Sequence, residues 1–131
     1  MKSRSETCIL IVDDDKEVLN TLQRILQKRD YQVFTCDKPT QALEMLQSQP
    51  MDLILSDLKM PEMNGIQFLY QVKQDHPAIP VILVTGFGSI DSAVKTIQWG
   101  GFDYLQKPFE AKKIYEVIER ALASSKPSVQ P

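Results

Sequence analysis

The 131-residue sequence predicts an α/β fold built around one parallel sheet. Short apolar runs of four or five residues alternate with longer segments of helical periodicity, which is the pattern of repeated βα units. The length suits a single domain, and a content of 43% apolar and 24% charged residues is typical of a folded protein. Right-handed crossovers favour a five-stranded sheet with helices on both faces. A closed barrel of eight such units would need a longer chain.

Five apolar runs are predicted to be strands, and polar residues bound most of them. In chain order they are residues 8–12, 31–36, 53–56, 81–84 and 102–106. Cys8 opens the first strand and Cys36 ends the second. Parallel neighbours would hold these two thiols at opposite ends of the sheet, so we expect no disulfide bond between them.

Five segments after these strands are predicted to be helices. The first, fourth and fifth carry an apolar stripe of the kind that packs one helical face against a core, and the second and third are shorter. The stripe of the first helix is Val18, Leu19, Leu22, Ile25 and Leu26, that of the fourth is Ile90, Ala93, Val94 and Ile97, and that of the fifth is Ile114, Val117, Ile118, Ala121 and Leu122. The second and third helices are predicted at residues 41–48 and 66–74. Trp99 follows the fourth stripe, and we expect it to be partly buried in the core, with a partner interface as the alternative.

The ends of the chain differ from its middle in composition. Residues 1–7 form a polar N-terminal tail, residues 8–123 form the predicted domain, and residues 124–131 are rich in Ser and Pro, as linkers are. The apolar run behind the first residues is too short for a signal peptide, and no stretch is long enough to span a bilayer, so we expect a cytoplasmic protein that does not enter the membrane. A net charge of -2 provides no broad face for nucleic acid, so any role in transcription would need a partner or a further domain.

Polar residues follow or end four of the predicted strands. They are Asp13, Asp14, Asp57, Thr85 and Lys107. Because the carboxyl ends of parallel strands meet at one edge of a sheet, we expect these side chains to form one site. Asp15, which precedes the first helix, is expected to be only a loop residue or a helix cap.

Three ionised carboxylates at one sheet edge require a cation. At about 4 Å and an effective dielectric of about 20, each pair repels by about 4 kcal/mol. Mg²⁺ suits such oxygen ligands because it binds through a few carboxylates and keeps waters for a phosphoryl group; Mn²⁺ is a second possibility. Lys107 and Thr85 would add a movable charge and a hydroxyl donor. Asp57 stands alone, so we interpret it as the nucleophile and Asp13 with Asp14 as the metal-holding pair.

Four segments of the chain carry a family resemblance: ILIVDDD at 9–15, DLILSDLKMPEMNG at 52–65, VILVTG at 81–86 and FDYLQKPF at 102–109. In this order and spacing they resemble the receiver domain of bacterial two-component response regulators, over about residues 7–123. Segments 86–94 and 100–104 are most similar to receivers of the nitrogen-regulation type of transcriptional activator. The resemblance implies a flavodoxin-like (βα)5 three-layer sandwich with a parallel sheet in the order 2-1-3-4-5.

The same resemblance implies a role for each strand-end residue. Asp57 would accept a phosphoryl group from a sensor histidine kinase, and Asp13, Asp14, Asp57 and the backbone carbonyl of Lys59 would bind Mg²⁺. The domain would then be a signalling switch rather than an enzyme, with at most slow self-phosphorylation from small donors and slow autodephosphorylation.

The remaining implied residues concern the switch. Thr85 and Lys107 would contact phosphate oxygens, Tyr104 would be the aromatic residue that swings inward on activation, and the Lys107–Pro108 peptide bond would be cis. The fourth helix, fifth strand and fifth helix would form the surface for an effector domain or a homodimer partner.

Three other functions are less consistent with these residues. A phosphatase of the haloacid dehalogenase type expects a second acid two residues after its nucleophile, where this chain has Lys59. A pseudo-receiver that works without phosphorylation usually lacks one of the acids or the lysine, and this chain has them all. A flavin site would need a phosphate-binding loop after the first strand, where the acids at 13–15 would repel the phosphate.

Overall fold

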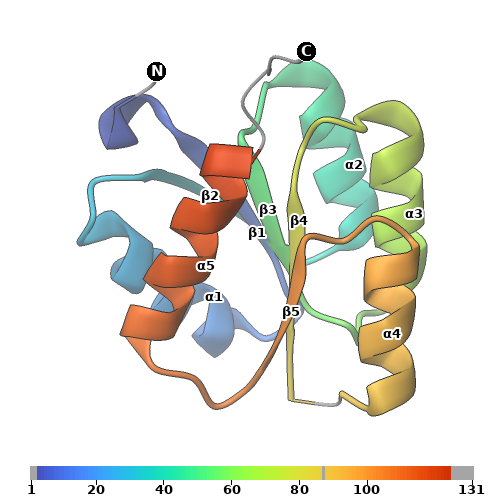
Figure 1. Cartoon of the computed structure of the whole chain (residues 1–131). Coiled ribbons are helices and arrows are strands. Elements are labelled where there is room, and N and C mark those ends of the chain that lie inside the picture. Colours follow the sequence, from blue (N-terminus) through green and yellow to red (C-terminus); the bar gives the residue numbers. More distant parts are fainter. Residues whose placement is uncertain (1–2, 87, 125–131) are drawn as a thin grey trace.

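A computed structural model describes residues 3–86 and 88–124 and shows one parallel sheet between two layers of helices (Figure 1). The sheet has five strands in the order β2-β1-β3-β4-β5, which confirms the predicted fold class and strand order. The strands are β1 (Cys8–Val12), β2 (Gln32–Cys36), β3 (Leu53–Ser56), β4 (Val81–Thr85) and β5 (Asp103–Gln106). The three central strands are almost wholly buried, because helices cover both of their faces.

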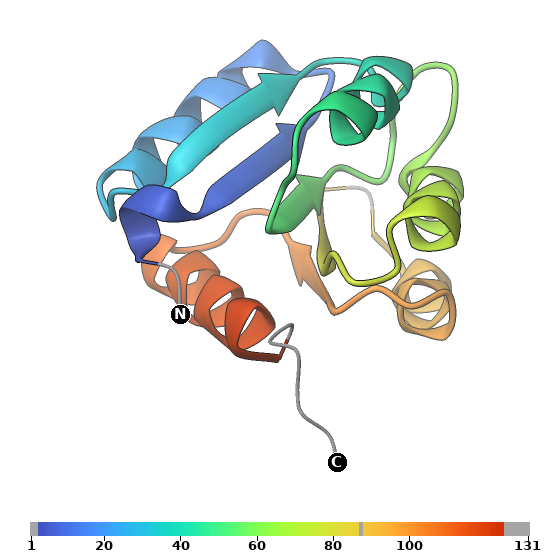
Figure 2. The same ribbon diagram turned by 90° about the horizontal axis from the view of Figure 1, so that it is seen from above.

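The helices divide into two groups, as Figure 2 shows from above. One face of the sheet carries α1 (Lys16–Gln27) and α5 (Ala111–Ser124), and the other carries α2 (Pro39–Ser48), α3 (Gly65–Asp75) and α4 (Ile90–Gln98). A short 3₁₀ helix, η1 (Arg4–Glu6), precedes β1. Among the described residues, no helix combines the length and the apolar character that crossing a bilayer requires.

Each face of the sheet buries its own apolar cluster. Leu22 and Leu26 of α1 and Ile118 of α5 pack on one side, while Phe68 and Val72 of α3 pack on the other. The predicted stripes of α1 and α5 therefore face the core. Asp15 caps α1, where its side chain accepts a hydrogen bond from the Glu17 amide at 2.9 Å. Cys8 and Cys36 are both free thiols.

The fourth helix differs from the sequence prediction. Its apolar stripe lies largely in solvent: Ile90 is 84% exposed, Val94 50% and Ile97 55%. Thr96 is the one buried residue of this helix. The physical reason is position, because α4 lies at the edge of its layer beside β5 and α3, where too little sheet lies beneath it to cover the stripe.

Trp99 is partly buried, as expected, but it packs against α3 at the surface rather than in the core. Its side chain is 47% exposed, and its ring packs edge-on against Tyr70 of α3 with the ring centroids 5.1 Å apart. The exposed large apolar side chains among the described residues all belong to α3 or to α4 and its C-terminal cap. This side of the molecule therefore offers an apolar surface.

The end of the predicted N-terminal tail is attached to the sheet. Thr7 is buried, and its carbonyl accepts a hydrogen bond from the Gln32 amide at 3.0 Å. Residues 1, 2 and 125–131 of the two predicted tails lie outside the described residues.

Candidate functional site

Neighbouring strands carry two of the predicted acids to one edge of the sheet. Val12 of β1 lies opposite Ser56 of β3, so Asp13 and Asp57 leave the sheet side by side. The Asp57 amide donates to the Val12 carbonyl at 2.9 Å, which extends the ladder by one residue. Parallel pairing therefore places these carboxylates next to one another, as the strand-end pattern predicts.

The two acids are joined by a third. Carboxylate oxygens of Asp13, Asp14 and Asp57 all lie within 4.8 Å of one another. Asp13 and Asp57 are only 2% and 4% exposed, while Asp14 faces solvent. At this separation and an effective dielectric of about 20, each pair repels by about 3–4 kcal/mol. The cluster is therefore unfavourable unless positive charge lies beside it.

Lys107 supplies part of that charge. Its ammonium group lies 3.1 Å from Asp13 Oδ2 and 4.0 Å from Asp57 Oδ2, so it bridges the two buried carboxylates. The Lys107 amide donates to the Thr85 carbonyl at 2.8 Å, which attaches the residue to the end of β4. The Lys107–Pro108 peptide bond is cis.

Asp13 remains electrostatically unfavourable despite this lysine. Burial raises the pKa of its carboxyl above the usual value, and the Asp57 charge raises it further. A hydrogen bond from the Asp15 amide to Asp13 Oδ1 and the proximity of Lys107 lower the pKa, but the sum is still upward. One ammonium group thus compensates only part of the negative charge.

Asp57 is held rigidly by its own loop. Its Oδ1 accepts a hydrogen bond from the Leu58 amide at 2.7 Å, while Oδ2 faces Lys107. Behind it, the buried Ser56 hydroxyl donates to the Asp57 carbonyl at 2.9 Å. A Cβ atom on Gly65 would lie 2.4 Å from the same carbonyl oxygen, so only glycine permits α3 to begin this close to the acid.

The other predicted residues lie at different distances from the cluster. Thr85 is fully buried at the end of β4, and Lys59 lies two residues after Asp57. Tyr104 lies opposite Leu83, two residues before Thr85, and its hydroxyl contacts Ser92 of α4 at 2.7 Å. Ser92 is not among the predicted site residues, and no local sequence signal indicates a contact between β5 and α4.

The donor set is suited to a small hard cation. Three carboxylates with ligand atoms within 4.8 Å provide oxygen ligands, and Asp14 leaves one side of the cluster open to solvent. Burial first and the Asp57 charge second raise the pKa of Asp13, and a divalent ion beside the cluster would oppose both effects by favouring the ionised carboxylate. The residues present therefore fit Mg²⁺.

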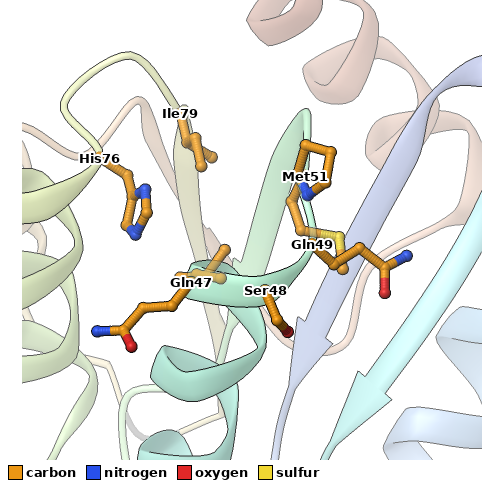
Figure 3. Close-up of a pocket in the computed structure, with 8 residues that line it drawn as sticks. Gln47, Ser48, Gln49, Met51, His76 and Ile79 are labelled. Carbon is orange, nitrogen blue, oxygen red and sulfur yellow. The ribbon is translucent and has the colours of Figure 1, made fainter.

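A pocket elsewhere in the protein has a different chemical character. It has a volume of about 380 Å³ and lies where α2 ends and the loop before β4 passes, so Gln47, Met51, His76 and Ile79 surround it (Figure 3). These segments precede β3 and β4, so the pocket lies at the opposite edge of the sheet from Asp57. Its lining contains no carboxylate. It therefore takes no part in the chemistry of the acidic cluster.

Comparison with known proteins identifies the family. The sequence profile of the response regulator receiver domain matches residues 9–119. The chain belongs to the response-regulator receiver family. Its relatives include the DNA-binding transcriptional regulator NtrC of Escherichia coli (strain K12), which is 38% identical over 123 residues, and the transcriptional regulatory protein ZraR of the same strain, 40% identical over 115 residues.

These matches cover most of this receiver but little of the relatives. The alignments span 94% and 88% of this chain but only 26% of each regulator, so the chain corresponds to about a quarter of their length.

Solved receiver structures have the same fold. A response regulator receiver domain from Clostridium thermocellum is 30% identical with a TM-score of 0.87, and the alignment covers 92% of this chain and 97% of that one. The beryllofluoride-activated NtrC4 receiver domain dimer also gives a TM-score of 0.87 at 30% identity, covering 91% and 98%.

Proposed function

We propose that this receiver accepts a phosphoryl group on Asp57 from a sensor histidine kinase, in a reaction that depends on Mg²⁺. The observation that carries this proposal is the cluster itself: three carboxylates with ligand atoms within 4.8 Å, and a lysine that bridges the two buried ones. An arrangement that concentrates negative charge and one mobile cation at a sheet edge suits phosphoryl transfer, where alignment and charge neutralisation provide most of the catalysis.

The two Asp57 oxygens have different surroundings, which supports different roles for them. The Leu58 amide donates to Oδ1, and we infer that Oδ2 would be the attacking atom. A P–O bond forms at Oδ2 as the P–N bond to the donor imidazole breaks. Lys107, 4.0 Å from Oδ2, is close enough to move onto a phosphoryl oxygen. Thr85, at the end of β4, would donate its hydroxyl to another.

Asp13, Asp14, Asp57 and the Lys59 carbonyl would hold the metal ion. Mg²⁺ supplies charge neutralisation on the oxygens of the transferring group when it is bound. Asp14 is the exposed member, so it would keep the cation accessible to an incoming donor.

The product would act as a switch for a partner. Thr85 and Lys107 would be drawn to the new phosphoryl group, and Tyr104 would repack beside them. The surface of α4, β5 and α5 would then contact an effector domain or a second copy of the chain. The exposed apolar side chains Ile90, Val94 and Ile97 on α4 support an interface there. Receivers are signalling domains rather than turnover enzymes, and two free thiols agree with a reducing, cytoplasmic compartment.

Incubation with acetyl phosphate and Mg²⁺, followed by intact-mass measurement, tests the proposal. We expect the parent protein to gain the mass of one phosphoryl group, and Asp57→Asn and a sample treated with a chelator to gain none. Equal labelling of Asp57→Asn, or labelling that survives the chelator, would refute the assignment of the acceptor or of the metal.

A further inference from the structure

A single hydrogen bond joins the proposed switch residue to the fourth helix. The Tyr104 hydroxyl of β5 lies 2.7 Å from Ser92 Oγ in the first turn of α4, in a partly buried environment. The Tyr104 ring packs against the apolar cluster on the α2 and α3 side of the sheet. The contact therefore links a partly buried ring to a helix whose apolar face lies in solvent.

Ser92 also belongs to the N-terminal cap of α4. The Ser89 amide donates to Ser92 Oγ at 2.9 Å, and the Ser92 amide donates to Ser89 Oγ at 3.1 Å, which is a reciprocal capping box. Ser92 Oγ lies 3.0 Å from the Ser89 carbonyl, where its one hydrogen is used. The cap and the tyrosine therefore share the Ser92 hydroxyl.

Gly88, which precedes α4, also approaches the Tyr104 hydroxyl closely. A Cβ atom on Gly88 would lie 2.0 Å from the Tyr104 hydroxyl oxygen, so this position accepts only glycine while the ring stays in place. Gly88 lies three residues after Thr85, in the segment that leads from the acidic site to α4. The ring thus contacts both the loop and the helix that the loop precedes.

Within the part of the chain that the structure describes, α4 buries little apolar surface. Thr96 is its one buried side chain, and its hydroxyl bonds within the helix, to the Ser92 carbonyl at 2.8 Å. A helix with little apolar burial is held mainly by its caps and by contacts such as the one from Tyr104. Loss of that contact should therefore loosen the first turn of α4.

We propose that Ser92 is a positioning residue that makes the Tyr104 ring and the first turn of α4 move together. If Tyr104 leaves its present position, Ser92 loses a hydrogen bond or the helix follows the ring. Either outcome changes how Ile90 and Val94 are presented at the surface. This inference rests on the proposed function, because it gives the path from the phosphoryl group at Asp57 to that surface.

Amide hydrogen exchange tests the coupling without any phosphoryl group. We expect Tyr104→Phe and Ser92→Ala each to speed exchange of the backbone amides at positions 92 and 93 by about two- to ten-fold, the range that one side-chain hydrogen bond supports. In the Ser92→Ala background, Tyr104→Phe should change exchange by less than about two-fold. Full additivity of the two variants would refute the coupling.

Two further variants control this experiment. Ser92→Thr keeps a hydroxyl and should restore the slow exchange. Tyr115→Phe removes a matched tyrosine hydroxyl that donates to the Ile25 carbonyl on the other side of the sheet, and should leave the α4 amides unchanged. Faster α4 exchange in Tyr115→Phe would show that any lost tyrosine bond loosens the helix, and would overturn the proposal.

A titration with beryllofluoride and Mg²⁺ separates positioning from stability. Trp99, the one tryptophan, ends α4 and reports on the helix by fluorescence. We expect Tyr104→Phe to shift the apparent beryllofluoride affinity two- to ten-fold in the parent and less than two-fold in Ser92→Ala. Equal affinities in all variants would refute positioning while leaving the proposed function intact. No binding by the parent would instead refute the proposed function, and the exchange experiment would still decide the coupling.

Discussion

Asp13 is the residue at which the needs of folding and of the site conflict most clearly. Burial raises the pKa of its carboxyl. A group that binds its proton more tightly in the folded state makes the protein less stable as the pH rises from the usual pKa of the group through the raised pKa. Above that window the loss is complete and constant. The conflict is typical of a group retained for binding rather than for stability.

We therefore expect Asp13→Asn to stabilise the protein at pH 7. The gain should be about 0.5–2 kcal/mol, the range for relieving one unfavourable charge. It should shrink as the pH falls through the raised pKa of Asp13, and it should vanish below the usual pKa of an aspartate carboxyl, where the parent side chain is protonated in both states. Urea unfolding across this pH range measures it, and a variant that is less stable than the parent at pH 7 would contradict the account of Asp13.

Gly65, the first residue of α3, does not have a left-handed φ; Glu62 carries the positive φ in that loop. Gly65 is needed because the Asp57 carbonyl approaches it too closely for a side chain. The sequence shows that a glycine is present but cannot show which distant atom it makes room for.

At the level of elements, α4 and α5 carry similar stripes with opposite roles. Ile114 of α5 is fully buried, whereas Ile90 of α4 is 84% exposed. Periodicity identifies an amphipathic helix but not what lies beneath it, which depends on where the helix sits on the sheet. The residues alone therefore predicted the strands and the cap at Asp15, and the family resemblance predicted the order of the sheet, but neither predicted the solvent-facing stripe of α4.

The same substitution in the two helices should therefore have unequal effects. Ile114→Ala should lower the free energy of unfolding by about 2–5 kcal/mol, because it leaves a cavity in the core. Ile90→Ala should change it by less than about 0.5 kcal/mol, as surface substitutions do. Denaturant titration of both variants measures this, and a comparable loss at Ile90 would place α4 against the core.

In the molecule as a whole, residues far apart in the sequence meet because parallel strands end at one edge. Asp13, Asp57, Thr85 and Lys107 are carried there by β1, β3, β4 and β5. Strand-end positions were sufficient to predict this meeting. The contact between Tyr104 and Ser92 depends on side-chain geometry across two elements, so the sequence gives no sign of it.

A cation held by this edge should stabilise the whole fold. At tenfold excess over its dissociation constant, Mg²⁺ should add about 1.4 kcal/mol to the free energy of unfolding. Asp14→Asn should lose most of this effect, while the variant Asp91→Asn, at another exposed acid on α4, should keep it. Thermal unfolding with and without Mg²⁺ compares them, and equal shifts in the two variants would argue against a site at Asp14.

Chemical trapping of the phosphorylated residue tests the central claim most directly. An acyl phosphate on an aspartate is reduced by borohydride to an alcohol, which converts that residue to homoserine. After acetyl phosphate and Mg²⁺, peptide mass spectrometry should find homoserine at position 57, and only when both reagents were present. Homoserine at Asp13 or Asp14 instead, or at no position, would contradict the assignment of Asp57 as the phosphoacceptor.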